Sequence, residues 1–205
     1  MRFFWVLLLS ILFVNKTVLA DSYFTVGSDP GDDFASIQPA IDAAPSGYSI
    51  YVDDGTYTEN LLISGKELTI SGNSLDSDAV KIIGKITVGT AANVELQYFS
   101  LDATGYTSGI LLKGIAKVKY GHIFGAKNGV TVASGGKLET YEETIGWNSA
   151  YGVLCRSGGQ IRIDSSSITN NTKAGIRVIK NRRIHPVWLN ETTLSGNASA
   201  LQIVG

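Results

Sequence analysis

Residues 129–148 read GVTVASGGKLETYEETIGWN, and residues 152–171 read GVLCRSGGQIRIDSSSITNN. The two stretches share Gly-Val, Ser-Gly-Gly, one aliphatic residue and a final asparagine at an offset of 23 residues, while most other positions differ. A repeat of this length is typical of one supersecondary unit stacked on copies of itself. We therefore expect the shared residues to contact the next copy and the variable residues to carry any function.

Columns of small and apolar residues extend this repeat along the chain, and the segments between them are short and alternate in polarity. Alternation with Gly, Asn and Ser punctuation predicts strands of a few residues, about three in each coil. The fold class predicted is therefore all-β, a right-handed parallel β-helix of roughly seven coils about 4.8 Å apart. The aliphatic columns expected inside are Ile110, Val130, Val153, Ile176, Leu201; Leu101, Ile123, Ile145, Ile168, Leu194; Leu96, Val118, Thr140, Ile163, Leu189; and Val132, Cys155, Val178, Ile203.

Two residue types in the repeat have a structural interpretation. Asn148, Asn171 and Asn197 each follow an inward aliphatic residue by three positions. Asparagine tolerates a left-handed backbone at a sharp corner, and its amide bonds well to the amide one coil away, so we expect an asparagine ladder. Cys155 is the only cysteine and falls in an inward column, which indicates a small core residue and excludes an intrachain disulfide.

The first twenty residues have the layout of a secretory signal peptide. Arg2 precedes an apolar run from Phe3 to Val14, and Ala20 stands at the cleavage point. The run is shorter than the roughly 20 apolar residues of a spanning helix, which favours cleavage and export over a membrane anchor. Removing Arg2 and Lys16 leaves 15 cations against 18 acids, a net charge of −3. With no polybasic run, we expect no nucleic-acid partner, and no membrane contact after cleavage.

Residues 21–205 are expected to form one domain that opens with a short helix. Phe34, Ile37, Ile41 and Ala44 lie on one helical face, and Ser36 stands at the expected N-cap. Such a helix ahead of the first coil is expected to cover the open apolar end of the solenoid.

At this point the chain resembles the pectin-lyase-like superfamily, and its N-terminal segment resembles pectin methylesterases. The resemblance implies a right-handed parallel β-helix and an extracellular or periplasmic protein that acts on polysaccharide. The Gln-Asp-Thr and Asp-Phe-Ile-Phe-Gly segments of pectin methylesterases do not occur, so no catalytic residue is carried over. The matching residues are Asp33-Phe34, Ile37-Gln38, Ala40-Ile41-Asp42-Ala43-Ala44-Pro45, Ile50-Tyr51-Val52 and Gly55-Thr56-Tyr57-x-Glu59-Asn60.

In this superfamily, ligands lie along the outer face of the strand that follows the Ser-Gly-Gly corner. The register predicts one outward column of Glu95, Lys117, Glu139, Arg162 and Trp188, and beside it a second of Gln97, Lys119, Tyr141, Asp164 and Asn190. One interpretation is structural, because opposite charges on adjacent strands satisfy one another. The other is a shallow sugar-binding strip, in which aromatic faces and charged groups share the ligand. The candidate substrate-binding residues are Lys117, Lys119, Glu139, Tyr141, Arg162, Asp164 and Trp188.

Two other groups of residues are weaker candidates, one for a catalytic carboxylate pair and one for a metal site. Glu142 and Glu143 lie beside the strip, and with Asp164 they would offer a carboxylate pair, but adjacent residues on a strand point to opposite sides. His122 and His185 have no partner at metal-ligand spacing, so no metal or other cofactor is expected.

Two functions remain open after these observations. The first is a secreted protein that binds or processes an extracellular polysaccharide of acidic type, with catalysis undecided. The second is a non-catalytic structural or surface-interaction solenoid. Because residues 201–205 open a new coil without a cap, we also expect self-association there, or further coils.

Overall fold

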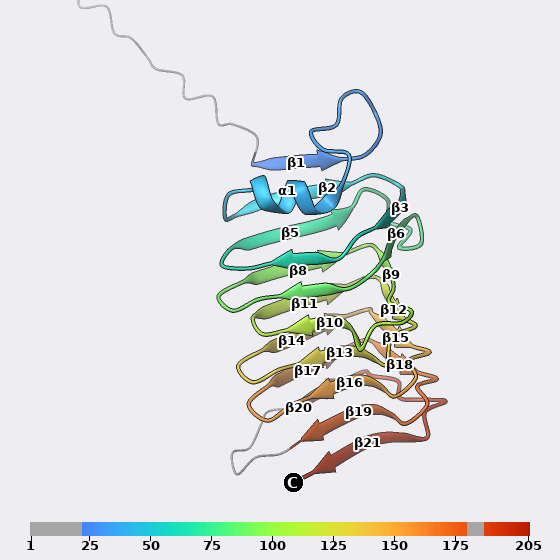
Figure 1. The fold of residues 1–205 in the computed structure, drawn as a ribbon. Coiled ribbons are helices and arrows are strands. Elements are labelled where there is room, and N and C mark those ends of the chain that lie inside the picture. The colour runs from blue at the N-terminus through green and yellow to red at the C-terminus, as the bar shows by residue number, and fades with distance from the viewer. Residues whose placement is uncertain (1–21, 180–186) are drawn as a thin grey trace, which may run out of the picture.

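The computed structural model describes residues 22–179 and 187–205, and the expected signal peptide lies outside them. The chain winds into a parallel β-solenoid, with β1 at one end and β21 at the other (Figure 1). Every strand pairs in parallel with a strand of the neighbouring coil, and three sheets run the length of the stack. The expected all-β solenoid is confirmed.

We name the three sheets A, B and C in the order in which each coil visits them. Sheet A contains β1 (Tyr23–Val26), β2 (Tyr48–Val52), β5 (Glu67–Gly72), β8 (Asn93–Gln97), β11 (Ile115–Lys119), β14 (Lys137–Tyr141), β17 (Gln160–Asp164) and β20 (Val187–Asn190). Sheet B contains β3 (Gly55–Thr58), β6 (Val80–Ile83), β9 (Ser100–Asp102), β12 (His122–Phe124), β15 (Thr144–Gly146) and β18 (Ser167–Thr169). Sheet C contains β4 (Leu61–Ile63), β7 (Ile86–Val88), β10 (Ser108–Leu112), β13 (Asn128–Val132), β16 (Tyr151–Cys155), β19 (Ala174–Ile179) and β21 (Ser199–Val204).

The number of coils differs from the expected seven. Sheet A has eight strands among the described residues, which makes about eight turns. The additional strand is β1, which pairs only with β2 and precedes the helix. Its four residues lie outside the repeat, so the 23-residue rhythm gives no sign of it.

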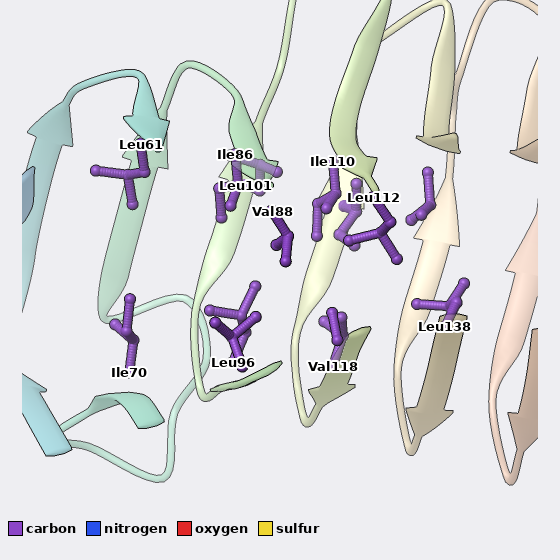
Figure 2. Close-up of a cluster of buried hydrophobic side chains, with 14 of the residues drawn as sticks. Leu61, Ile70, Ile86, Val88, Leu96, Leu101, Ile110, Leu112, Val118 and Leu138 are labelled. Carbon is purple, nitrogen blue, oxygen red and sulfur yellow. The ribbon is translucent and has the colours of Figure 1, made fainter. Parts of the chain in front are cut away.

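The aliphatic columns pair in the predicted register and meet inside the solenoid, except in the last coil. There Leu189, Leu201 and Ile203, which are predicted to lie inside, are exposed because no described strand pairs with β20 or β21 on the far side. Ile123 pairs with Leu101 and Ile145, and Ile145 pairs with Ile168. Figure 2 shows side chains of successive coils facing one another in the interior. Cys155 is fully buried in its column, and burial raises the pKa of its thiol to about 11. The prediction that it is a core residue is confirmed.

The glycine of each repeated Gly-Val also has a packing role. A Cβ added to Gly129 would collide with the side chains of Ile145 and Asn148. A Cβ on Gly152 would collide with Ile168 and Asn171 in the same way. The repeat therefore has glycine here because the isoleucine of sheet B and the ladder asparagine leave no room for a side chain.

The asparagine ladder is present, with its hydrogen bonds running from one coil to the next. Asn148 donates through Nδ2 to Asn171 Oδ1 over 2.9 Å, and Asn171 donates through Nδ2 to Asn197 Oδ1 over 2.9 Å. The backbone N–H groups of Asn148 and Asn171 donate to the same oxygens.

One detail of the predicted ladder is wrong. The ladder asparagines are not the left-handed residues of the corner, because the residue before each of them takes positive φ. Trp147 has φ 51° and Asn170 has φ 55°. The ladder asparagine follows the bend, and this turns its amide into the interior, where the next coil supplies its partners.

A second row of left-handed residues forms the corner between sheets A and B. Each sheet A strand from β8 onward is followed by one residue with φ between 45° and 57°. This residue interrupts the alternation of the strand, so the next side chain points into the solenoid, as the burial of Phe99, Glu143 and Ser166 illustrates. The left-handed residues are Tyr98, Tyr120, Glu142, Ser165 and Glu191.

The expected helix is present as α1 (Ile37–Ala43), which packs against β1, β2 and β4 at the N-terminal end of the stack (Figure 1). Its buried face holds Ile37 and Ile41, as the spacing predicts, together with Ala40, whereas Phe34 and Ala44 lie just outside the helix. Ser36 occupies the N-cap position but makes no capping hydrogen bond with its side chain. The capping contacts come instead from Glu59, which accepts hydrogen bonds from the N–H groups of Ile37 and Gln38 over 2.8 and 2.9 Å.

Two further long side chains, Lys66 of the first coil and Gln38 of the helix, form hydrogen bonds between the helix and that coil. Lys66 donates to the carbonyl oxygens of Ile41 and Ala44 at the C-terminal end, each over 2.9 Å. Gln38 accepts from the Leu62 N–H over 2.7 Å and donates to its carbonyl over 3.2 Å. An amide side chain therefore satisfies the edge of β4 where no further strand of sheet C is present.

These contacts predict that Glu59, and not Ser36, stabilises the helix start. Glu59→Ala leaves two N–H groups without their acceptor and is expected to lower the free energy of unfolding by about 1–2 kcal/mol. Ser36→Ala is the matched control and is expected to change it by less than about 0.5 kcal/mol. Urea titration followed by circular dichroism measures both, and equal losses in the two variants would contradict the assignment.

The last described strand, β21, pairs only with β19 and exposes Leu201, Ile203 and Val204. Self-association at this end stays a prediction. The described part of the chain contains no helix with the length and apolar character needed to cross a membrane.

Candidate functional site

The outer face of sheet A carries both predicted columns in the predicted register. Glu139 pairs with Lys117 on β11 and with Arg162 on β17, and Arg162 pairs with Trp188 on β20. In the second column, Tyr141 pairs with Lys119 and with Asp164. The seven candidate residues therefore lie on four adjacent strands of one sheet.

Two adjoining hollows mark this face, and they share Glu139 and Arg162. The larger, which we call the groove, has a volume of about 440 Å³. The smaller, which we call the side pocket, has a volume of about 220 Å³ and is bounded by Trp188, whose side chain is 63% exposed. The groove is lined by Lys117, Lys119, Tyr120, Glu139, Thr140, Tyr141, Arg162 and Asp164.

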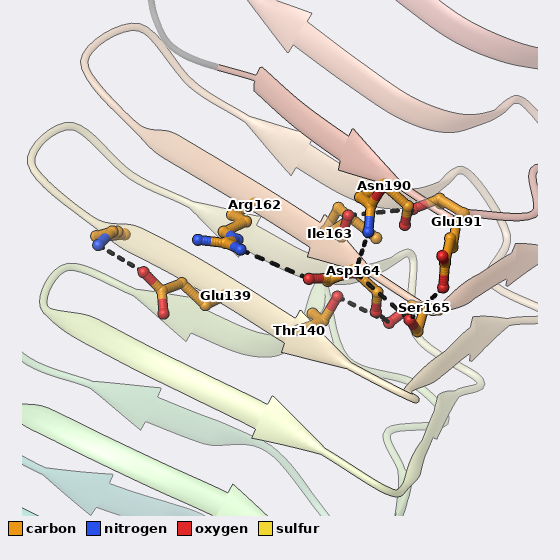
Figure 3. Close-up of polar contacts among 11 residues, drawn as sticks. Glu139, Thr140, Arg162, Ile163, Asp164, Ser165, Asn190 and Glu191 are labelled. Atoms are coloured by element: carbon orange, nitrogen blue, oxygen red, sulfur yellow. Dashed lines mark hydrogen bonds and ion pairs between the residues drawn. The ribbon is translucent and has the colours of Figure 1, made fainter.

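The alternation of charges predicts ion pairs directly across neighbouring strands. The ion pairs of this face are arranged differently. Lys137 Nζ lies 2.6 Å from Glu139 Oε1 within β14. Arg162 lies 3.6 Å from Asp164 within β17 (Figure 3). Residues two apart on a strand share a face about 7 Å apart, within reach of long side chains. The remaining pair is diagonal, between Lys119 and Glu95 at 2.7 Å.

Lys117 differs from the other cations of the groove. It is exposed, and no described residue forms a hydrogen bond or ion pair with its ammonium group. Its positive charge still reaches Glu139 and contributes to lowering the pKa of that carboxyl. The groove therefore contains one cation whose donors are free for a ligand.

The two carboxylates of the groove are held in the charged form. A hydrogen bond from Lys137 is the main cause that lowers the pKa of Glu139. The pKa of Asp164 is lowered chiefly because Asn190 donates to it over 2.8 Å (Figure 3). A general acid needs a raised pKa to keep its proton at neutral pH. Glu139 and Asp164 are therefore suited to accepting hydrogen bonds from hydroxyl groups, and not to donating a proton.

One wall of the groove consists of Tyr120 and Tyr141, of which the sequence argument found only Tyr141, and Tyr98 packs beside them. Tyr98 and Tyr120 stack with ring centroids 4.8 Å apart, and Tyr141 meets Tyr120 edge to face at 5.7 Å. A hydrogen bond with Glu142 is the main cause that raises the pKa of Tyr141. Tyr98 and Tyr120 recur at an offset of 22 residues in the sequence, which is the signal that could have identified them.

Glu142 and Glu143 do not join Asp164 in a carboxylate cluster. Glu142 is exposed at the left-handed corner, whereas Glu143 is 1% exposed and points into the solenoid. The Gly121 N–H donates to Glu143 Oε2 over 3.0 Å, and Oε1 has no partner. Burial raises the pKa of Glu143 well above its ordinary value. Among the described residues Glu143 is the one carboxyl group with a raised pKa, and it does not face the groove.

The described residues also contain no group of three or more His, Cys, Asp or Glu side chains able to hold a metal ion. His122 lies 3.2 Å from Asp78 through Nδ1, a partner 44 residues away that spacing in the sequence does not reveal. His185 lies outside the described residues.

Comparison with known proteins places this geometry in a known fold. No family model matches the chain. No curated protein matches it either. A crystal structure of Escherichia coli YbhC is similar with a TM-score of 0.58 at 13% identity, over 76% of this chain and 55% of that protein. The deglycosylated pectin methylesterase from Aspergillus niger has a TM-score of 0.57 at 17% identity, over 90% of this chain and 81% of that one. At these identities the likeness shows the fold alone, and this fold is the right-handed parallel β-helix of pectin methylesterases.

Proposed function

We propose that this protein binds an extracellular acidic polysaccharide in the groove of sheet A. The fold likeness to pectin methylesterase supports a pectin-related carbohydrate function. Secretion, which the N-terminal layout predicts, would bring the groove to such a polymer. Whether the protein also processes the polymer is left to experiment, because the groove offers ionised carboxylates and no general acid.

The observation that carries the proposal is the position of Lys117 beside the tyrosine wall. A uronate unit has a carboxylate for an unpaired ammonium group and an apolar ring face for an aromatic ring. Lys117, Tyr120 and Tyr141 line the same groove and supply both kinds of contact. Glu139 and Asp164 remain as acceptors for the hydroxyl groups of the sugar.

Binding to polygalacturonate, measured by isothermal titration calorimetry on the purified chain, tests the proposal. Lys117→Ala is expected to weaken binding about tenfold, which corresponds to one charge-assisted hydrogen bond of about 1.4 kcal/mol. Tyr141→Ala is expected to weaken it by a similar factor, because it removes part of the aromatic wall. A neutral glucan is expected to bind more weakly than the uronate polymer.

Lys81→Ala is the matched control, since it removes a cation from the outer face of sheet B, where Lys81 pairs with Asp102 at 3.3 Å. The same mixtures are followed for methanol release and new reducing ends, which detects any catalysis. Equal binding by native protein, Lys117→Ala and Lys81→Ala would reject the groove. If the protein has no affinity for any glycan, the second candidate function, a structural solenoid, is favoured. The ion pairs formed by Lys119 and Arg162 support that candidate.

A further inference from the structure

Exposed cations gather on the outer face of sheet C and on the connections at its two edges. No strand of sheet C contains Asp or Glu. Among the described connections that border this sheet there are two carboxylates. Glu59 is committed to the start of α1, and Glu191 lies at the sheet A end of the connection before β21, where Ser165 donates to it. The cations, which we call the basic face, are Lys85, Lys127 and Lys173 where the chain enters the sheet, Lys113 and Arg156 where it leaves, and Arg177 on β19.

The charges of the basic face are not neutralised within the protein. None of its six cations forms an ion pair with a described residue, although strands of sheets A and B contain four ion pairs of Lys or Arg. Arg177 donates to the hydroxyl of Tyr151 over 2.5 Å, which positions its guanidinium group without cancelling its charge. A face of one sign without counter-charges attracts anions from solution.

The cations are spaced regularly along the stack. Backbone hydrogen bonds link Lys127 to Ala150 and Ala150 to Lys173, so the two lysines are two coils apart. Lys113 and Arg156 are separated in the same way on the other edge. Since coils repeat every 4.8 Å, each row presents a cation about every 10 Å, and the rows lie about 17 Å apart across a five-residue strand.

This spacing suits a polymer whose charges are sparse. Duplex DNA carries one charge for about every 1.7 Å of its axis, far denser than the cations of either row. A polysaccharide with one carboxylate per sugar unit has wider spacing. Tyrosines accompany the cations, with Lys85 5.9 Å from the ring of Tyr106 and Lys173 5.9 Å from that of Tyr151. A cation beside an aromatic edge is a suitable contact for a charged sugar.

We propose that the basic face is a second binding surface, on which a carboxylated polysaccharide lies along the axis of the solenoid. The proposal takes its ligand class from the proposed function but uses none of the groove residues. A protein with both surfaces holds a long polymer at two places, and the second contact benefits from a high effective concentration.

The test compares three double variants for binding to long polygalacturonate at low and at high salt. Lys127→Ala with Lys173→Ala removes two cations from the basic face. Thr56→Glu with Thr58→Glu is the matched control, because it changes net charge by the same amount on the exposed face of β3. Lys117→Ala with Tyr141→Ala disables the groove. We expect the first variant to bind about tenfold more weakly at low salt, with less difference at high salt, and the control to keep native affinity.

Native affinity in Lys127→Ala with Lys173→Ala would overturn the proposal, and so would an equal loss in the threonine control. If the groove variant loses all binding, the basic face is rejected as a binding surface and the groove is kept as one. If only the lysine variant loses binding, the groove is rejected and the basic face stands. Tighter binding of duplex DNA or of vesicles rich in phosphatidylserine than of polygalacturonate would overturn the assigned ligand class.

Discussion

Replacing Asn171 with alanine is expected to lower the free energy of unfolding by about 2–5 kcal/mol, because it leaves several buried polar groups without partners. Asn148 loses the acceptor for both its side-chain amide and its backbone N–H. Asn197 Oδ1 loses the side-chain donor of Asn171 and keeps only the backbone N–H of residue 171. The carbonyl groups of Ile145 and Thr169 lose the Asn171 amide as a donor. Urea titration measures the loss, and a change below about 1 kcal/mol would show that the ladder contributes little.

The neighbouring residue supplies a control at almost the same place in the chain. Asn170 is exposed and has φ 55°, a conformation that glycine adopts without strain. Asn170→Gly is therefore expected to change the free energy of unfolding by less than about 0.5 kcal/mol. A loss in Asn170→Gly as large as that in Asn171→Ala would attribute the effect to the corner backbone and not to the ladder.

The buried Glu143 is expected to make the protein less stable as pH rises. In the unfolded chain its pKa is about 4.3, whereas burial in the folded protein raises the pKa well above the ordinary value. Below the unfolded pKa both states hold the proton. Above it the unfolded state releases the proton first, so stability falls by up to about 1.4 kcal/mol per pH unit until the folded pKa is passed. The stabilisation is thus present in acid and lost as pH rises.

Glu143→Gln should abolish that slope, because the amide imitates the protonated carboxyl at every pH. The variant is expected to match the native protein near pH 4 and to exceed its stability at pH 7, with the difference widening as pH rises. Thermal unfolding between pH 4 and pH 8 measures both curves. Glu142→Gln, on the exposed corner residue, is the control and should follow the native curve. Parallel curves for native protein and Glu143→Gln would contradict the assignment.

Much of the fold could be predicted from the sequence because a stacked repeat converts spacing into contact. Residues such as Ile123 and Ile145, one period apart, pair across adjacent coils, and the same register places Lys117 beside Glu139. The outer strip of sheet A follows from this periodicity. Its ion pairs do not, because they depend on the reach of long side chains along one strand, as for Lys137 and Glu139.

The corner residues were beyond prediction for a different reason. Tyr141 is predicted to point outward, so strict alternation would bury Glu142 and expose Glu143, which is the reverse of the structure. The left-handed backbone at Glu142 causes this reversal and directs Glu143 inward. Likewise, Glu59 reaches the helix start from 22 residues away, where local pattern favours Ser36.

The sequence by itself determined the solenoid, its register and the composition of its outer columns, because these depend on a period of about 23 residues that every coil repeats. Only the tertiary structure decided where charge accumulates. Lys85, Lys127 and Lys173 are more than 40 residues apart in sequence and form no basic run, yet the stack brings them to one edge of sheet C. Winding the chain sorts residues by their position within a coil, so a chain with a net charge of −1 presents a positive face.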